Sequence, residues 1–113
     1  MNCNANGFAQ QVLTLVSAAD IPAGTPVSLS ENYTAAAAAA NAPVFGVVLS
    51  CRDGVCAVQV QGAVTLSYSG TAPAVGFGCL VSDGSGGVKT ASDGTPLRIL
   101  AVDSVQSAVT FML

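Results

Sequence analysis

Residues 45–62 read FGVVLSCRDGVCAVQVQG, and this stretch decides the fold. An Asp-Gly dipeptide at Asp53 and Gly54 separates two valine-rich runs, which is the strongest short-range signal for a β-hairpin. In the second run, residues 58–61 (VQVQ) alternate apolar and polar side chains, as a strand with one buried face requires. The stretch therefore predicts two antiparallel strands, Phe45–Cys51 and Val55–Gln61.

Short valine-rich runs separated by Gly, Pro, Asp and Ser continue on both sides of this hairpin. That texture is typical of a small β-barrel or β-sandwich. The further predicted strands are Gln10–Val16, Pro26–Leu29, Ala63–Tyr68, Cys79–Val81, Gly87–Thr90, Leu97–Asp103 and Ala108–Leu113. We expect an all-β fold with little or no helix, as one β domain over residues 10–113 behind a flexible arm over residues 1–9.

The alanine run from Ala35 to Ala40 is the one segment with helix propensity. Alanine is the best helix former, but so short a run cannot hold a helix unaided and carries no apolar stripe. Pro43 would end any helix soon afterwards. We expect a loop or a single turn here, whose small side chains can lie flat against a neighbour.

A weak internal repeat relates the two halves of the chain. Residues 24–29 resemble 76–81, residues 45–50 resemble 98–103, and residues 58–61 resemble 109–112. The spacing between the matched segments is nearly constant, which favours two related β-modules. Chance similarity between short β segments is the alternative.

Charged residues make up only 8% of the chain and hydrophobic residues 51%, where about 25% charged is typical. This scarcity favours burial of much of the surface in an assembly, because the cores of interfaces are depleted in charge. The alternative is a neutral surface of Ser, Thr, Asn and Gln. Three basic residues and a net charge of −3 argue against nucleic acid and against an anionic membrane surface.

Catalytic chemistry finds little support in the residue types. The chain has no histidine, which removes the commonest general base and metal ligand. The aspartates mostly precede glycines in turn contexts, and no nucleophile elbow or phosphate-binding loop is present. The sequence therefore predicts a protein that is not an enzyme and takes no cofactor or small-molecule substrate. The N-terminus has no positive region or long apolar run, so we expect a protein made without a secretory signal.

The four cysteines allow three interpretations. Across the Asp-Gly turn, Cys51 and Cys56 face each other as a cross-strand pair, within the distance range that a disulfide accepts. They could instead be two thiols on a strand face, as is usual in a cytosolic product. The third interpretation is a zinc site of all four cysteines, although Cys3 and Cys79 lie far from the closely spaced pair.

The order of these features resembles the small capsid cement, or head decoration, proteins of tailed bacteriophages, of the DUF2190 type. The matching segments are residues 12–15, 21–27, 44–49, the Asp-Gly turn, 58–62, 74–76 and 109–113. The resemblance implies a β-barrel-like protein on the outer surface of the virion, made in the host cytoplasm. It also implies a homotrimer that binds the major capsid protein and stabilises the assembled shell. It carries no catalytic, cofactor or metal residues.

Two further expectations concern contacts. The N-terminal arm is a candidate to order on a partner, with contact residues Asn2, Cys3, Asn4, Asn6 and Phe8. The alternative function is a virion-displayed adhesion or glycan-binding module. Sugars stack on exposed aromatic rings, and Tyr33, in its polar Glu-Asn-Tyr-Thr context, is the best exposed candidate.

Overall fold

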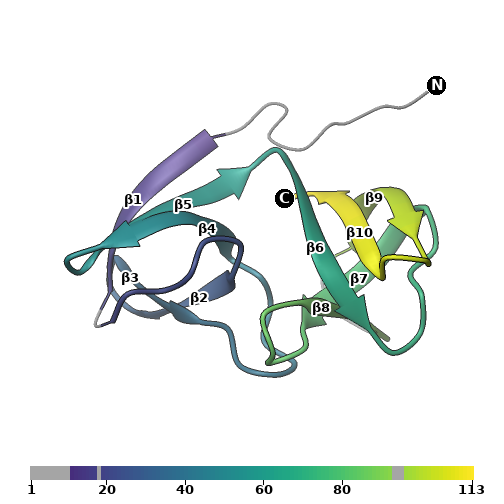
Figure 1. The fold of residues 1–113 in the computed structure, drawn as a ribbon, viewed down its shortest axis with the longest axis horizontal. Helices are drawn as coiled ribbons and strands as arrows, with labels where there is room; N and C mark the ends of the chain where they lie inside the picture. The colour runs from purple at the N-terminus through teal and green to yellow at the C-terminus, as the bar shows by residue number, and fades with distance from the viewer. Residues whose placement is uncertain (1–10, 18, 93–95) are drawn as a thin grey trace.

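The structure, a computed structural model, describes residues 11–17, 19–92 and 96–113. Within these ranges the chain forms ten β-strands and no helix, which confirms the all-β fold class. The strands close into two five-stranded barrels that lie side by side (Figure 1). The predicted N-terminal arm falls outside the described residues.

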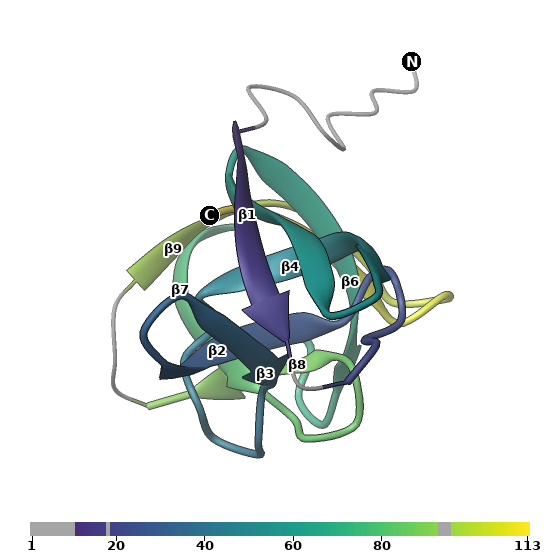
Figure 2. The ribbon, with the colours of Figure 1, turned by 90° about the vertical axis from the view of Figure 1, so that its left-hand side faces the viewer.

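The first barrel is built from the N-terminal half of the chain. Its strands are β1 (Gln11–Ser17), β2 (Pro26–Glu31), β3 (Thr34–Ala37), β4 (Gly46–Arg52) and β5 (Val55–Gln61). They close in the order β1-β3-β2-β4-β5, in which β1 and β3 run parallel and the other neighbours antiparallel. Figure 2 views the molecule from the side of this barrel. The predicted Asp53-Gly54 turn joins β4 to β5, with both residues at positive φ, as the tightest hairpin turns require.

The second barrel repeats this arrangement in the C-terminal half. Its strands are β6 (Ala63–Ser69), β7 (Gly76–Ser82), β8 (Val88–Ala91), β9 (Pro96–Asp103) and β10 (Ala108–Met112). They close in the equivalent order, β6-β8-β7-β9-β10, and β6 and β8 are again the parallel pair. The shared topology confirms the two related β-modules that the internal repeat predicts.

Strand register relates the modules residue by residue. Val48 pairs with Val58 in the first barrel, and Ile99 pairs with Phe111 in the second. The register shifts next to each of these pairs, at Leu49 on β4 and at Leu100 on β9, so Val48 corresponds to Ile99 and Val58 to Phe111. The sequence repeat instead matches Val48 to Ala101 and Val58 to Val109, because it does not take account of the longer β9–β10 turn.

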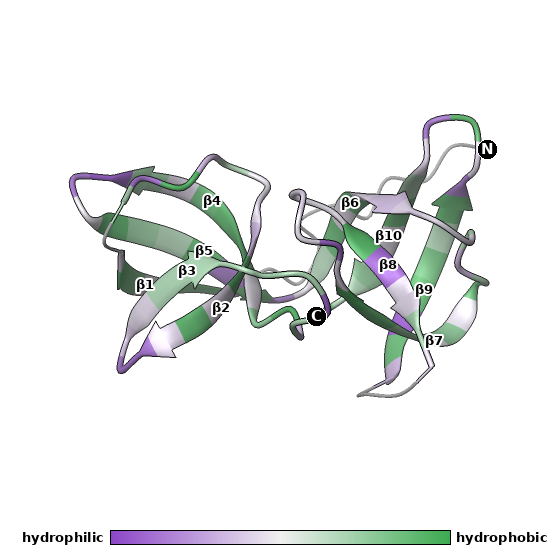
Figure 3. Cartoon of the chain, turned by 90° about the horizontal axis from the view of Figure 1, so that it is seen from below, coloured by the Kyte–Doolittle hydropathy of each residue, from purple (hydrophilic) through white to green (hydrophobic). Residues whose placement is uncertain are grey.

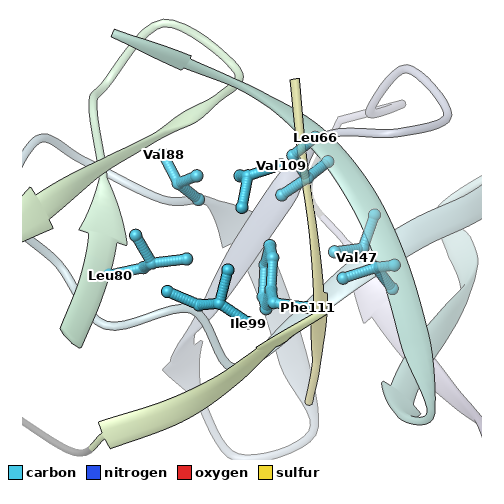
Figure 4. Close-up of a cluster of buried hydrophobic side chains, with 8 residues drawn as sticks. Val47, Leu66, Leu80, Val88, Ile99, Val109 and Phe111 are labelled. Carbon is cyan, nitrogen blue, oxygen red and sulfur yellow. The ribbon is translucent and has the colours of Figure 1, made fainter. Parts of the chain in front are cut away.

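Each barrel has its own apolar core, and two residues of the first module, Val47 and Val44, pack with the core of the second. Phe111 and Val109 are fully buried in the second core, together with Leu66. Val47, on β4 of the first barrel, packs into the same cluster (Figure 4). The two barrels therefore share apolar contacts at their junction.

The alanine run departs from the prediction in its first half, whereas Ala38, Ala39 and Ala40 lie in a loop and turn as expected. Ala35, Ala36 and Ala37 belong to strand β3, between β1 and β2, and not to a loop or turn. Pairing with strands on both sides outweighs the intrinsic helix preference of alanine, which is a weak effect per residue. Ala35 is 2% exposed, and its methyl group packs in the core of the first barrel.

The β3–β4 connection then lies against the second barrel. The Asn41 N–H donates to the Ser82 carbonyl and the Ser82 N–H donates to the Ala42 carbonyl, each at 2.9 Å. The Ser82 hydroxyl donates to the Ala38 carbonyl at 3.1 Å. The neighbour against which the alanine segment lies is therefore the other half of the same chain.

All nine predicted strands are present, and eight of them have shifted ends. Gln59 is a further departure, because alternation places it on the polar face of its strand, yet it is 2% exposed. Its amide nitrogen donates to the carbonyls of Gln61 at 3.2 Å and Ala63 at 3.1 Å. This outer face of β5 is buried at the point where the chain passes from one barrel to the next.

Candidate interaction surface

A groove of about 690 Å³ opens on the first barrel, beside the β2–β3 hairpin. It is lined by Leu13, Leu15, Leu29, Ser30, Glu31, Asn32, Tyr33 and Phe45. Leu15 is buried in the core, and Leu13 lies two residues earlier on the same face of β1. Since side chains two apart on a strand share a face, the groove extends the apolar interior of the barrel to the surface.

Three apolar side chains make the accessible floor and walls of the groove. Leu13 and Phe45 are each 40% exposed and Leu29 is 44% exposed. Glu31 is the only charged residue in the lining. The arrangement suits an uncharged, apolar ligand surface, as is usual at the mouth of a β-barrel.

Tyr33 stands at the rim of the groove in an unusual backbone conformation. Its φ is 56°, in the left-handed region that bulky residues rarely adopt. The ring is 76% exposed, and the Tyr33 carbonyl accepts a hydrogen bond from the Val16 N–H at 2.9 Å. The hairpin thus presents an aromatic ring to solvent at a turn position that favours glycine.

Apolar exposure extends beyond the groove. Figure 3 shows strands of both barrels largely in hydrophobic green and neutral white, with the strongest purple at turns and single strand positions. On the second barrel, Phe77 is 73% and Val75 is 65% exposed, and Leu100 on β9 is 47% exposed. Contiguous apolar surface marks contact sites on soluble proteins, and in the groove Leu13, Leu29 and Phe45 line one hollow.

Two of the cysteines meet as the hairpin predicts. Cys51 on β4 pairs in register with Cys56 on β5, next to the pair Arg52 and Val55 at the turn. In this structure the two sulfurs form a disulfide. Cys56 is fully buried in the core of the first barrel, so the bridge fastens the outer end of that barrel. A zinc site of all four cysteines is incompatible with this bonded state, because a disulfide leaves neither sulfur as a thiolate.

The remaining predicted site residues are not brought together. Cys79 lies half-buried on β7 of the second barrel. Cys3 and the other predicted arm contacts, Asn2, Asn4, Asn6 and Phe8, fall outside the described residues. Within the ranges that the structure describes, no three His, Cys, Asp or Glu residues gather in a way that could hold a metal ion.

The surroundings of the Asp83 carboxylate, in the β7–β8 turn, change its pKa. Partial burial acts to raise the pKa, but hydrogen bonds to the charged form outweigh it and lower the pKa below its usual value. The donors are the backbone N–H groups of Ser85, at 2.7 Å, and Gly87, at 3.0 Å, and the Ser69 hydroxyl, at 3.2 Å. These bonds close the β7–β8 turn, so the role of Asp83 is to shape a loop.

Comparison with models of known protein families yields no match, and comparison with curated proteins yields none either. Among the described residues, no helix has the length and apolar character that crossing a bilayer demands.

The groove itself was not predicted from the sequence. Leu13 and Leu29 look like ordinary core residues of their strands, and only the paired strands show which of them remain uncovered.

Proposed function

We propose that this chain is a structural, non-enzymatic protein that cements a bacteriophage head from its outer surface. The observation that carries the proposal is the extent of exposed apolar side chain on a nearly uncharged β surface. On the first barrel this surface includes the groove, and on the second it includes Phe77 and Val75. The order of the sequence features resembles that of capsid cement proteins, and for this reason we propose a bacteriophage head as the assembly.

The physical argument is one of burial. Apolar surface transferred from water contributes about 25 cal/mol per Å², so a protein that leaves such residues exposed gains stability when an assembly covers them. Few charges need to be desolvated on contact, which lowers the cost of binding. A symmetric oligomer, for which the resemblance favours a homotrimer, repeats each contact, and a lattice of capsid subunits adds avidity.

The test uses purified heads that lack the protein. We expect the added protein to cosediment with expanded heads and to raise the temperature at which they release DNA. Bovine serum albumin at equal concentration serves as the control for nonspecific adsorption. Heads that take up none of the protein, or that take it up without any gain in stability, would sink the proposal.

A second candidate function is glycan binding, which the exposed ring of Tyr33 favours. Aromatic rings stack on sugar faces, and Asn32 and Glu31 beside the ring could donate or accept hydrogen bonds. In this case a glycan array would show binding that Tyr33→Ala abolishes. An array without hits, or with hits that survive this substitution, removes the candidate.

A further inference from the structure

In the second barrel, the site equivalent to the groove is already occupied by a segment of the first module. Residues 41–47 run from the Asn41 and Ala42 backbone bonds with Ser82 to Val47, which packs in the second core. Val44, between them, packs against the same cluster. The occupant is thus an uncharged segment that leaves a turn at Asn41, whose φ is 69°, and that offers backbone hydrogen bonds at this end and valine side chains at the other.

Strand register identifies the equivalent positions in the first barrel. Ala35 on β3 pairs with Ser17 on β1, as Val88 on β8 pairs with Tyr68 on β6. On their other sides Ala35 pairs with Leu29 and Val88 pairs with Ser82. Leu29 is 44% exposed, whereas Ser82 is fully buried. In the second barrel the covering segment buries this position, which is Ser82 on β7. In the first barrel the equivalent position, Leu29 on β2, is open to solvent.

The β1 strand shows the same contrast. Leu13 pairs with Val58, as Val64 pairs with Phe111 in the second barrel. Leu13 is 40% exposed, while Val64 is 3% exposed and belongs to the cluster that includes Val47. Both positions that the covering segment buries in one barrel therefore line the groove of the other.

The backbone at this position is also available for pairing. β2 pairs with β4 only at Pro26 and Val27, so beyond Val27 no strand lies on that side of β2 within the described ranges. At the equivalent Ser82, both the N–H and the carbonyl bond to the covering segment. Leu29 holds the same register, so its N–H and carbonyl face the groove and can accept an added extended segment.

We propose that the groove of the first barrel binds an uncharged segment of a partner protein through backbone hydrogen bonds and valine side chains, in the way that the second barrel binds residues 41–47. This deepens the proposed function and rests on it, because the partner is the protein of the surface that the chain cements. This segment of the chain is not the occupant, because Asn41, Ala42, Val44 and Val47 already contact the second barrel and Phe45 belongs to the lining of the groove itself. The single charged side chain of the lining, Glu31, disfavours an acidic segment.

The test uses a synthetic peptide with the sequence of residues 38–48, AAANAPVFGVV, added to the isotope-labelled full chain. Amide shifts of Leu29 and Ser30 and methyl shifts of Leu13 are expected to move with peptide concentration. Leu29→Glu should weaken binding by about tenfold or more, because the peptide would desolvate a carboxylate. Leu13→Gln is a second, milder variant, and thermal unfolding shows whether each variant remains folded.

Matched controls separate the groove from general stickiness. Leu100→Glu introduces the same charge at a residue of similar exposure, 47%, on the second barrel, and is expected to leave peptide binding unchanged. A peptide with aspartate in place of Val44 and Val47 is expected not to bind. Equal weakening by Leu29→Glu and Leu100→Glu, or shifts confined to other surfaces, would overturn the proposal.

Other occupants give distinct results. If the chain self-associates without peptide and Leu29→Glu alone abolishes this, a second copy fills the groove and a separate partner does not. If the chain without peptide shows contacts between residues 2–9 and the groove, and the peptide abolishes these contacts, the N-terminal segment is the occupant. Either result overturns the inference. Failure of the proposed function gives a different result, because the wild-type protein would then not bind heads at all. If heads bind the wild-type protein and Leu29→Glu equally well, only the proposal that the groove binds the partner is refuted.

Discussion

Phe111→Ala is expected to lower the free energy of unfolding by about 3–5 kcal/mol, the usual cost of truncating a fully buried phenylalanine. Phe111 is the largest fully buried side chain and stands between Val47 and Ile99 in the second core (Figure 4). Its removal leaves a cavity that the surrounding valines and leucines cannot fill. Typical domains have only about 5–15 kcal/mol of stability, so the variant would be close to unfolding. Urea denaturation followed by far-UV circular dichroism measures the change.

Phe77→Ala is the matched control, because Phe77 is the same residue type at 73% exposure. Its truncation should change the stability by no more than about 0.5 kcal/mol. Since Val47 joins the two barrels, Phe111→Ala should also shift the unfolding of the first barrel, in a single transition. Two separate transitions, or equal effects of both substitutions, would contradict the shared core.

Gly46→Ala is expected to be the other strongly destabilising change, by about 1–3 kcal/mol or more. A Cβ on Gly46 would lie 2.5 Å from Val58 Cγ1 and 2.7 Å from the Gln59 carbonyl oxygen. Backbone cannot yield as the end of a side chain can, so β4 and β5 would have to separate. Val47 follows Gly46 on β4, so movement of this strand would also disturb the junction of the barrels. Thermal unfolding of the purified variant is the measurement.

Gly78→Ala provides the comparison for this prediction. A Cβ there would meet only Ile99 Cδ1, at 2.9 Å, and the end of a flexible side chain can rotate away. A change of about 1 kcal/mol or less is therefore expected at Gly78. If the two alanine variants unfold at the same temperature, the close approach at Gly46 carries no energetic weight.

Local signals were sufficient for most of the strands. The Asp-Gly turn and the alternation that follows it define β4 and β5, and the predicted and observed bounds of β5 are the same, Val55–Gln61. β3 was missed because Thr34–Ala37 has no β-branched or alternating pattern beyond Thr34. Its strand conformation comes from the parallel pairing with β1 and the antiparallel pairing with β2, which no local window contains.

The groove shows the same limit. The sequence indicates an apolar, weakly charged surface and singles out Tyr33, which is indeed exposed at the rim. The sequence does not show that Leu13 is exposed and Leu15 buried, or that Leu29 is exposed and Val27 buried. The two members of each pair lie on the same face of their strand. Which member stays uncovered depends on where the β3–β4 connection lies, and that is a long-range contact.

The sequence by itself determined the all-β class and the hairpin that brings Cys51 and Cys56 together, and it favoured two related modules over chance similarity. These follow from short-range turn chemistry and from the two-residue period of strands. Only the tertiary structure decided the closure into two barrels, the burial of Gln59 at their junction and the filling of one groove but not the other. The reason is that closure and burial depend on contacts between residues far apart in the chain, whereas turns and alternation depend on neighbours.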